Sequence, residues 1–512
     1  MSADALHFPR PVRTFPRLMD RGWTMTTTNR RDLTPVLDRV DRTLDGSLER
    51  LFEFLRIPSI SAQPAHAADC RRAADWLCAE LKAIGLDASV RETPGHPMVV
   101  AHDRVAAGDA AGDGRDVPHV LFYGHYDVQP VDPLDLWHSD PFAPQLIRDA
   151  DGARIVARGA SDDKGQVMTF VEALRALRAE QGRLPLRVSM VIEGEEESGG
   201  ANLLPFLEAN REELRADVAL ICDTGMLEGG VPAITTALRG MVGEDVTIHC
   251  ADRDLHSGLY GNAARNPLEL LCGILASVRD PRTGRVVLPG FYDGVRDPSP
   301  EVRAQWRAIA PSDADVLGPV GLSVPAGELG YTAVEQTWCR PTFEINGMTG
   351  GYAGDGFKTV LPARASAKVS FRLVSGQDPA PIRDAFRAHV RAMLPPDCTA
   401  TFESHGGSRA SVVPEDGPAL RAALLALGAE WGRPAVTIGS GGSIPVVSEV
   451  RQALGMDSLL IGFAREDDRI HSPNEKYDLV SFHRGIRSWV RVLDALAHDG
   501  APDGTRDMAG AA

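Results

Sequence analysis

Several features of other protein classes are missing from this 512-residue sequence. No apolar run approaches the roughly 20 residues that a membrane-spanning helix needs. No basic block stands out, which argues against a nucleic-acid-binding surface. The N-terminus carries arginines without the apolar stretch of a secretory signal. A phosphate-binding G-x-x-x-x-G-K-[ST] loop is also missing, so an NTPase is not indicated. We therefore expect neither a membrane nor a nucleic acid as partner.

Cysteine is scarce, with seven scattered residues, an odd number, and no CxxC pair. This pattern argues against a disulfide framework or a thiolate zinc site and favours reduced thiols, hence a cytoplasmic protein. The net charge is −16, from 70 acidic and 54 basic residues. An acidic surface mainly favours solubility, although it can also conceal a site for multivalent cations.

The chain is too long for one simple core, so we expect two domains. From about residue 47, short apolar strands such as 119–124, 186–192 and 217–222 alternate with amphipathic helices. This pattern predicts an α/β domain with a mostly parallel sheet covered by helices on both faces. Near residue 238 the pattern changes to strands that alternate apolar and polar residues, which is typical of a half-exposed antiparallel sheet.

The first pattern returns late in the chain, so the α+β domain is predicted to be inserted into the α/β catalytic domain. An amphipathic helix within the insertion is expected to begin at Asn266, with Pro267 at its first position. A second methionine, Met25, precedes a more usual opening than Met1. The expected limits are a disordered tail 1–30, the catalytic domain 31–237 and 414–500, the inserted domain 238–413, and a tail 501–512.

Acidic and imidazole side chains stand where the predicted strands of the catalytic domain end. The motif GHYDVQP follows strand 119–124, the motif GEEESGG follows strand 186–192, and Asp223 follows strand 217–222. Further candidates lie in the loops ARGASDDKG and FAREDDRIHSPNEK. Ligands of open α/β sheets collect at the carboxyl ends of the strands. We therefore expect these distant segments to converge on one crevice.

The side chains in these motifs suit divalent metal ions. Imidazole and carboxylate without thiolate are ligands for zinc, manganese or cobalt. Two histidines and three carboxylates are too many for one catalytic zinc, which uses three protein ligands. They suit two metals that share a carboxylate, about 3.5–4 Å apart. Each motif alone is more typical of a surface pair, a solvated face or a helix cap, but their agreement at the strand ends favours a metal site.

These motifs resemble those of the dinuclear metallopeptidases that include aminoacylase, carboxypeptidase G and carnosinase. The resemblance runs from about residue 47 to 497 and is strongest to the branch of carnosinase and the cytosolic nonspecific dipeptidases. The segments that carry it are GHYDVQP, RGASDDKG, EGEEESGG, DLHSGLYGN, KTVLPARASAKVSFRLV, GGSIPV and IHSPNEK.

The resemblance implies a role for each metal-site residue. The implied ligands are His125 and Asp223 for one metal, Glu197 and His471 for the other, and Asp162 as the bridge. Glu196 is the implied general base, and Asp127 orients His125 from behind. Family members usually have two glutamates before the serine, whereas here Glu195 makes a third. Counting back from Ser198 gives these roles, and a shift by one residue would move both.

The resemblance also implies that the inserted domain is a lid or dimerisation domain, with substrate contacts in or near it. Arg372 alternates with two apolar neighbours, which alone indicates an ordinary solvated arginine, but the resemblance implies that it binds the terminal carboxylate of the substrate. Thr359 and Ser443 match further contact positions. His256 would stabilise the tetrahedral oxyanion. In relatives this histidine reaches the active site of the partner subunit, which implies a homodimer.

Three functions follow as hypotheses. The first is metal-dependent hydrolysis of dipeptides or short peptides with a free C-terminal carboxylate, by a metal-bridged water that a glutamate base activates. Two divalent ions, zinc before manganese or cobalt, are the expected cofactors. The second is an N-acyl- or N-carbamoyl-amino-acid amidohydrolase with the same site. The third, a binding protein with a dead metal site, is disfavoured because all ligands and the base are present. A serine hydrolase is disfavoured too, because residues 439–443 lack G-x-S-x-G spacing.

Overall fold

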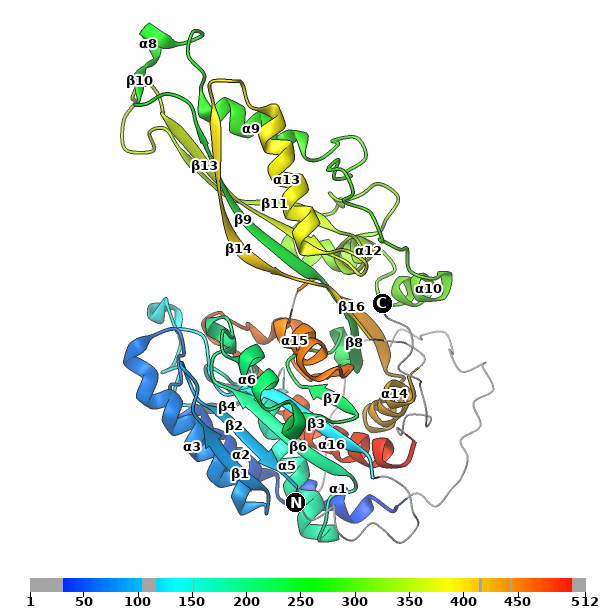
Figure 1. The fold of residues 1–512 in the computed structure, drawn as a ribbon. Coiled ribbons are helices and arrows are strands. Elements are labelled where there is room, and N and C mark those ends of the chain that lie inside the picture. Colours follow the sequence, from blue (N-terminus) through cyan, green and yellow to red (C-terminus); the bar gives the residue numbers. More distant parts are fainter. Residues whose placement is uncertain (1–30, 104–116, 151, 414–416, 443, 500–512) are drawn as a thin grey trace.

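The computed structural model describes residues 31–103, 117–150, 152–413, 417–442 and 444–499. The predicted tails 1–30 and 501–512 lie outside the described residues, and so does Ser443. Figure 1 shows two bodies, which we call the large domain and the lid. The large domain holds the beginning and end of the described chain, and the lid is formed by the middle of the chain.

A mixed sheet forms the centre of the large domain, in the order β1-β2-β6-β3-β7-β17-β8-β15, with β16 also paired to β8. Its strands are β1 (Asp87–Arg91), β2 (Met98–His102), β3 (His119–His125), β6 (Arg187–Glu193), β7 (Val218–Ile221), β8 (Ala233–Leu238), β15 (Ser411–Val412), β16 (Val436–Ser440) and β17 (Ser458–Ile461). The central strands β6, β3, β7 and β17 run parallel. The pairs β1-β2, β2-β6, β17-β8 and β15-β8 are antiparallel. The predicted mostly parallel sheet is confirmed at its centre.

Alternate residues of the strands pack into two hydrophobic cores, one on each face of the sheet. On β3, Val120 and Phe122 belong to the first core, and Leu121 and Tyr123 belong to the second. Burial of both faces explains why these strands are apolar throughout. The helices of the first core are α1 (Thr34–Arg42), α2 (Leu44–Leu55), α3 (Ala67–Ala83), α5 (Lys164–Gln181), α14 (Pro418–Trp431) and α16 (Leu479–Asp499), and those of the second are α6 (Leu203–Ala209), α7 (Arg211–Leu214) and α15 (Pro445–Leu454).

The lid is an antiparallel sheet in the order β11-β13-β9-β14, with two helices packed on one face. Its main elements are β9 (Gly240–His249), α9 (Pro267–Ser277), β11 (Thr342–Gly350), β13 (Arg364–Leu373), α13 (Pro379–Met393) and β14 (Thr399–Ser408). The rings of Phe343, Phe371 and Phe386 meet in its core. The predicted cap at Asn266 is confirmed, because its side chain accepts a hydrogen bond from the Leu268 backbone N–H at 3.0 Å.

Smaller elements complete the described fold. They are the sheet of β4 (Gln145–Asp149), β5 (Gly152–Val156) and β18 (Lys476–Asp478), the pair β10 (Leu255–His256) and β12 (Val360–Leu361), and the helices α8 (Ser257–Tyr260), α10 (Pro300–Ile309), α11 (Ala314–Leu317) and α12 (Ala333–Trp338). No described helix combines the length and the apolar character needed to cross a membrane. The seven cysteines are free thiols.

The chain enters the lid between β8 and β9 and leaves it between β14 and β15. The two crossings touch at Gly240, where an added Cβ would lie 2.3 Å from the Ser408 carbonyl oxygen and 2.6 Å from the Ala410 nitrogen. A larger residue at Gly240 would therefore force the crossings apart. The individual domain limits 237/238 and 413/414 stay predictions.

A segment of the lid between α9 and β11 also contacts the large domain. Trp338 of α12 packs against Val436 and Ile438 of β16. Gln305 of α10 donates a hydrogen bond to the Thr437 carbonyl at 3.0 Å. This segment is therefore a third connection between the lid and the edge of the large sheet.

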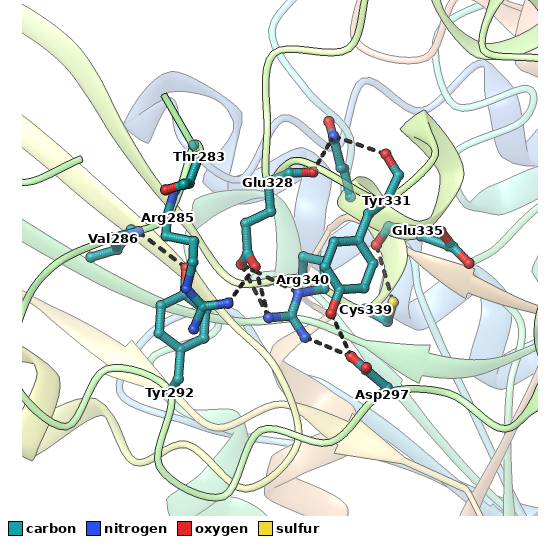
Figure 2. Close-up of polar contacts among 12 residues, drawn as sticks. Thr283, Arg285, Val286, Tyr292, Asp297, Glu328, Tyr331, Glu335, Cys339 and Arg340 are labelled. Carbon is teal, nitrogen blue, oxygen red and sulfur yellow. Dashed lines mark hydrogen bonds and ion pairs between the residues drawn. The ribbon is translucent and has the colours of Figure 1, made fainter. Parts of the chain in front are cut away.

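A buried ion-pair network holds this segment together (Figure 2). The guanidinium of Arg340 binds both carboxylate oxygens of Glu328, at 2.9 Å for the closest pair, and Arg285 donates to the same carboxylate at 3.2 Å. Asp297 accepts hydrogen bonds from Arg340 at 3.1 Å and from the hydroxyl of Tyr331 at 2.7 Å. Arg340 and Glu328 are 4% and 3% exposed, so the charge of each is stabilised by the other and not by water.

We predict that Arg340→Met strongly destabilises the protein, because it leaves the Glu328 carboxylate buried with Arg285 as its remaining cationic partner. Removing one partner of a buried pair typically costs about 3–5 kcal/mol. Lys368→Met is the control, since Lys368 pairs with Asp245 on the exposed face of the lid, where such pairs contribute less than about 1 kcal/mol. Urea unfolding measures both, and equal losses would contradict the prediction.

Candidate metal centre

The strand order brings the predicted motifs to one edge of the large sheet. The strand β3 lies between β6 and β7 and runs parallel to both. Its last residue, His125, pairs with Glu193, the last residue of β6. Asp223 follows the end of β7 by two residues. The carboxyl ends of parallel strands share one edge, so His125, Asp223 and the glutamates after Glu193 become neighbours.

Two groups of three side chains gather at this edge, and Asp162 belongs to both. Within each group the candidate ligand atoms lie within 4.8 Å of one another. The first group is His125, Asp162 and Asp223, and the second is Asp162, Glu197 and His471. The structure thus brings together all five residues that the sequence motifs suggested as ligands, in the two sets that the resemblance implied.

Asp162 faces a histidine on each side. Its Oδ1 lies 3.1 Å from His125 Nε2, and its Oδ2 lies 2.9 Å from His471 Nε2. His471 Nε2 is also 3.2 Å from Glu197 Oε2. A carboxylate that offers one oxygen to each half of the site has the arrangement that a bridging ligand needs.

Asp127 lies behind His125. Its Oδ1 is 3.4 Å from His125 Nδ1, and the Asp127 carbonyl is 3.1 Å from the same nitrogen. Its Oδ2 accepts hydrogen bonds from the hydroxyl of Ser61 at 2.6 Å and from the backbone N–H of Glu197 at 3.0 Å. Asp127 therefore connects the imidazole to the glutamate turn. No sequence motif pointed to Ser61, which lies 66 positions from Asp127.

Two of the three adjacent glutamates, Glu195 and Glu197, have different partners. Glu195 accepts hydrogen bonds from the His96 backbone N–H at 3.0 Å and from Asn202 Nδ2 at 2.6 Å, so its carboxylate stabilises the surrounding turns. Glu197 instead approaches His471 and accepts a hydrogen bond from Gln129 Nε2 at 2.7 Å. This arrangement favours the register counted back from Ser198. Gln129 had a signal in the sequence, since it belongs to the same motif as His125.

Crowded carboxylates shift the pKa values at this site. Burial raises the pKa of Glu196 to about 7, with the charges of Glu197 and Asp162 adding to the shift. Burial and the charge of Asp162 also raise the pKa of Asp223. Hydrogen bonds to Asp162 and Glu197 raise the pKa of His471 to about 10. All three shifts show that the site favours additional positive charge.

The residues fit divalent cations by a further criterion. Glu197 Oε1 is buried and has no hydrogen-bond partner among the described residues. A buried carboxylate oxygen without a partner is costly, and a cation beside it would remove that cost. The donor set of imidazole and carboxylate groups is that of zinc, manganese or cobalt.

The predicted substrate residues lie elsewhere. His256 and Thr359 are exposed and neighbour each other, with the Ser257 N–H donating to the Thr359 carbonyl at 3.1 Å. Figure 1 has β10 and α8 at the end of the lid that points away from the large domain. Within one chain these two residues therefore do not reach the metal centre.

Arg372 lies on β13 between the buried Phe371 and Leu373, and its side chain is less buried than theirs, as the alternation predicted. Burial and the charge of Arg372 lower the pKa of Arg239 to about 10. Arg239 donates to the Gly441 carbonyl at 2.9 Å. Arg372 thus belongs to the part of the lid near the crossings.

Known proteins resemble this chain in sequence and in fold. Residues 121–495 match the model of peptidase family M20/M25/M40. The chain is 29% identical over 487 residues to the Cys-Gly metallodipeptidase dug1 of Schizosaccharomyces pombe, covering 91% of this chain and 98% of that protein. It is 30% identical over 463 residues to the cysteinylglycine-S-conjugate dipeptidase of Corynebacterium striatum, covering 90% and 95%.

A solved structure of a dipeptidase also resembles this chain. Human carnosine dipeptidase 1 superposes with a TM-score of 0.74 at 26% identity, covering 92% of this chain and all of that one (100%). The branch of dipeptidases and carnosinase that the motifs suggested is thereby confirmed. Because the family model spans most of the sequence, this chain belongs to peptidase family M20/M25/M40.

Proposed function

We propose that this protein is a dinuclear metallodipeptidase, which hydrolyses dipeptides and short peptides with a free C-terminal carboxylate. The observation that carries the proposal is the pair of histidine–carboxylate groups that share Asp162 at the strand ends. The names of the relatives support it, since two similar along their whole length are dipeptidases. The alternative amidohydrolase has less support, because a solved hydantoinase/carbamoylase structure is 13% identical and shares the fold alone.

The cofactors we propose are two divalent ions, zinc before manganese or cobalt. His125 and Asp223 would hold one, Glu197 and His471 the other, and Asp162 would contact both. Such ions supply Lewis acidity, which polarises a scissile carbonyl and acidifies water. The seven free cysteines agree with a reducing cytoplasmic compartment.

Glu196 is the proposed general base. Its carboxylate takes a proton from the attacking water and gives it to the nitrogen of the departing amine. Burial raises the pKa of the Glu196 carboxyl above its usual range, which favours uptake of the proton from water. Asp127 holds the Nδ1 side of His125 and thereby keeps Nε2 turned toward Asp162.

Substrate binding is proposed to need the lid and a second subunit. The guanidinium of Arg372 would bind the C-terminal carboxylate in a bidentate pair, and Ser443 would add a further contact. His256 and Thr359 lie far from the metal groups of their own chain, so we propose that they complete the site of the partner in a homodimer. His256 would there stabilise the oxyanion, and lid closure would assemble these groups.

A substrate panel with metal-reconstituted protein tests this function. Free dipeptides should be hydrolysed, and a chelator should abolish the reaction. Matched dipeptides with an amidated C-terminus should lose roughly 10- to 100-fold in kcat/KM, the usual effect of one lost charged hydrogen-bonding group. Faster turnover of N-acyl or N-carbamoyl amino acids than of dipeptides would establish the alternative instead.

We predict that Glu196→Gln lowers kcat by about 10²–10⁴ without loss of metal, because the amide cannot take up the proton. Metal analysis of the purified variant and steady-state kinetics on one dipeptide measure the two effects. A variant with turnover near that of the unaltered protein would show that Glu196 is not the base.

The neighbouring glutamates give a matched pair of variants. Glu197→Gln should bind about half of the metal, because it changes a proposed ligand of one of the two ions. Glu195→Gln should keep both ions, since its carboxylate is bound to His96 and Asn202. Metal analysis after dialysis separates them, and the opposite result would shift the register by at least one residue.

A further inference from the structure

One carboxylate close to the metal centre has no role in the proposed reaction. Glu475 is completely buried and lies four residues after His471, at the end of the same loop. Its Oε1 accepts hydrogen bonds from the backbone N–H groups of Ser161 at 2.9 Å and Asp162 at 3.0 Å. Its Oε2 accepts from the Gly159 N–H at 2.9 Å and from Arg158 Nη1 at 2.8 Å. All four hydrogen bonds of this carboxylate therefore come from residues 158–162.

That segment is the loop that carries Asp162. Three of the four donors are backbone groups of the turn between β5 and α5, so the contacts fix the path of the backbone. The Ala157 N–H also donates to the Glu475 carbonyl at 3.2 Å. Glu475 therefore fixes the backbone from which the Asp162 carboxylate projects.

The same residue also stands at the end of the loop that carries His471. Arg469, His471 and Asn474 have φ angles of 56°, 63° and 63°, in the left-handed region that is unfavourable for residues other than glycine. Such a conformation persists where surrounding contacts determine it. The fully buried Glu475 is the anchor that follows this strained stretch, while the His471 side chain is 52% exposed.

We propose that Glu475 is a positioning residue that sets the metal affinity of the site, by holding the loops of Asp162 and His471 at a fixed separation. The inference rests on the proposed metal-dependent function. It adds to that function a group that touches neither metal nor substrate. The Glu475 carboxylate makes four of the hydrogen bonds that join the two loops, and the Ser161 hydroxyl adds one to Asp468 at 2.7 Å. The geometry of Glu475 therefore influences how well Asp162 can serve both halves of the site.

The choice of acid over amide at position 475 follows from the donors. A glutamine offers one accepting oxygen and one donating NH₂ group. Whichever way the amide is turned, its NH₂ group would face two of the four donors and lose both hydrogen bonds. In one orientation the loss falls on Ser161 and Asp162, and in the other it falls on Gly159 and Arg158.

The test is the metal affinity of Glu475→Gln in the full-length protein, measured as bound zinc against a chelator series. We expect about 10- to 100-fold weaker retention, the range found when groups that orient metal ligands are removed. Excess zinc should restore activity, because the ligands and the base are intact. Glu475→Asp keeps the charge but is one methylene shorter, so we expect an intermediate loss, and this variant decides the matter if the glutamine variant does not fold.

Glu430→Gln is the matched control. Glu430 is also a buried carboxylate of the large domain, bound to Arg487 at 2.6 Å and Arg491 at 2.7 Å. It should lower the unfolding midpoint of the metal-free protein as Glu475→Gln does, without weakening zinc retention. Unchanged retention in both Glu475 variants, or an equal loss in Glu430→Gln, would overturn the proposal.

Different results would refute the proposed function. Absence of zinc binding by the unaltered protein would refute the metal-dependent function, and with it the role of Glu475. Zinc binding without peptide hydrolysis would refute the peptidase activity, while the comparison of Glu475 and Glu430 variants would still decide the positioning role.

Discussion

The proposed activity depends on a concentration of negative charge at the carboxyl ends of the central strands. Asp162, Glu196, Glu197 and Asp223 lie close together, and burial raises the pKa of both Glu196 and Asp223. Burial opposes the protonation of His125, yet its hydrogen bonds to Asp127 and Asp162 raise its pKa. Such crowding is unfavourable for folding alone. The presence of these carboxylates at the carboxyl ends of the central strands is best explained by bound cations.

Other carboxylates around this group, Asp163, Asp127 and Glu475, accept hydrogen bonds mostly from neutral backbone donors. Asp163 accepts from the His125 N–H at 3.0 Å, Asp127 accepts from the Glu197 N–H, and Glu475 accepts from three backbone groups. The cation nearest in sequence, Lys164, turns its ammonium to the carbonyls of Phe54 and Ile57 at 3.2 and 2.6 Å. Backbone donors fix geometry without cancelling the charge, which leaves that charge available to metal ions.

The sequence revealed the parts of this arrangement that are local. The central strands could be predicted because they are apolar throughout, and the metal-site residues because they follow those strands directly. The local pattern does not separate Glu195 from Glu197, since three identical side chains differ only in what lies opposite them, and His96 is 99 positions away. The count back from Ser198, which rests on the resemblance, does separate them. Ser61 was missed because it is distant in the sequence, and Glu475 was missed although it lies in the motif of His471. The contact between Glu475 and Asp162 spans 313 positions (|i−j|), and no local pattern encodes such a contact.

The lid is in direct contact with residues 439–441 of the large domain. Its crossings touch at Gly240, which confines the covalent links to one place. Trp338 of the lid packs on Gly439, where an added Cβ would lie 2.7 Å from the Trp338 Cβ. Gly439 begins the stretch that continues to Gly441, whose carbonyl accepts the hydrogen bond of Arg239. Trp338 and Gly439 leave no space between them, so the lid closure proposed above, which would bring Arg372 toward a substrate, would also move residues 439–441.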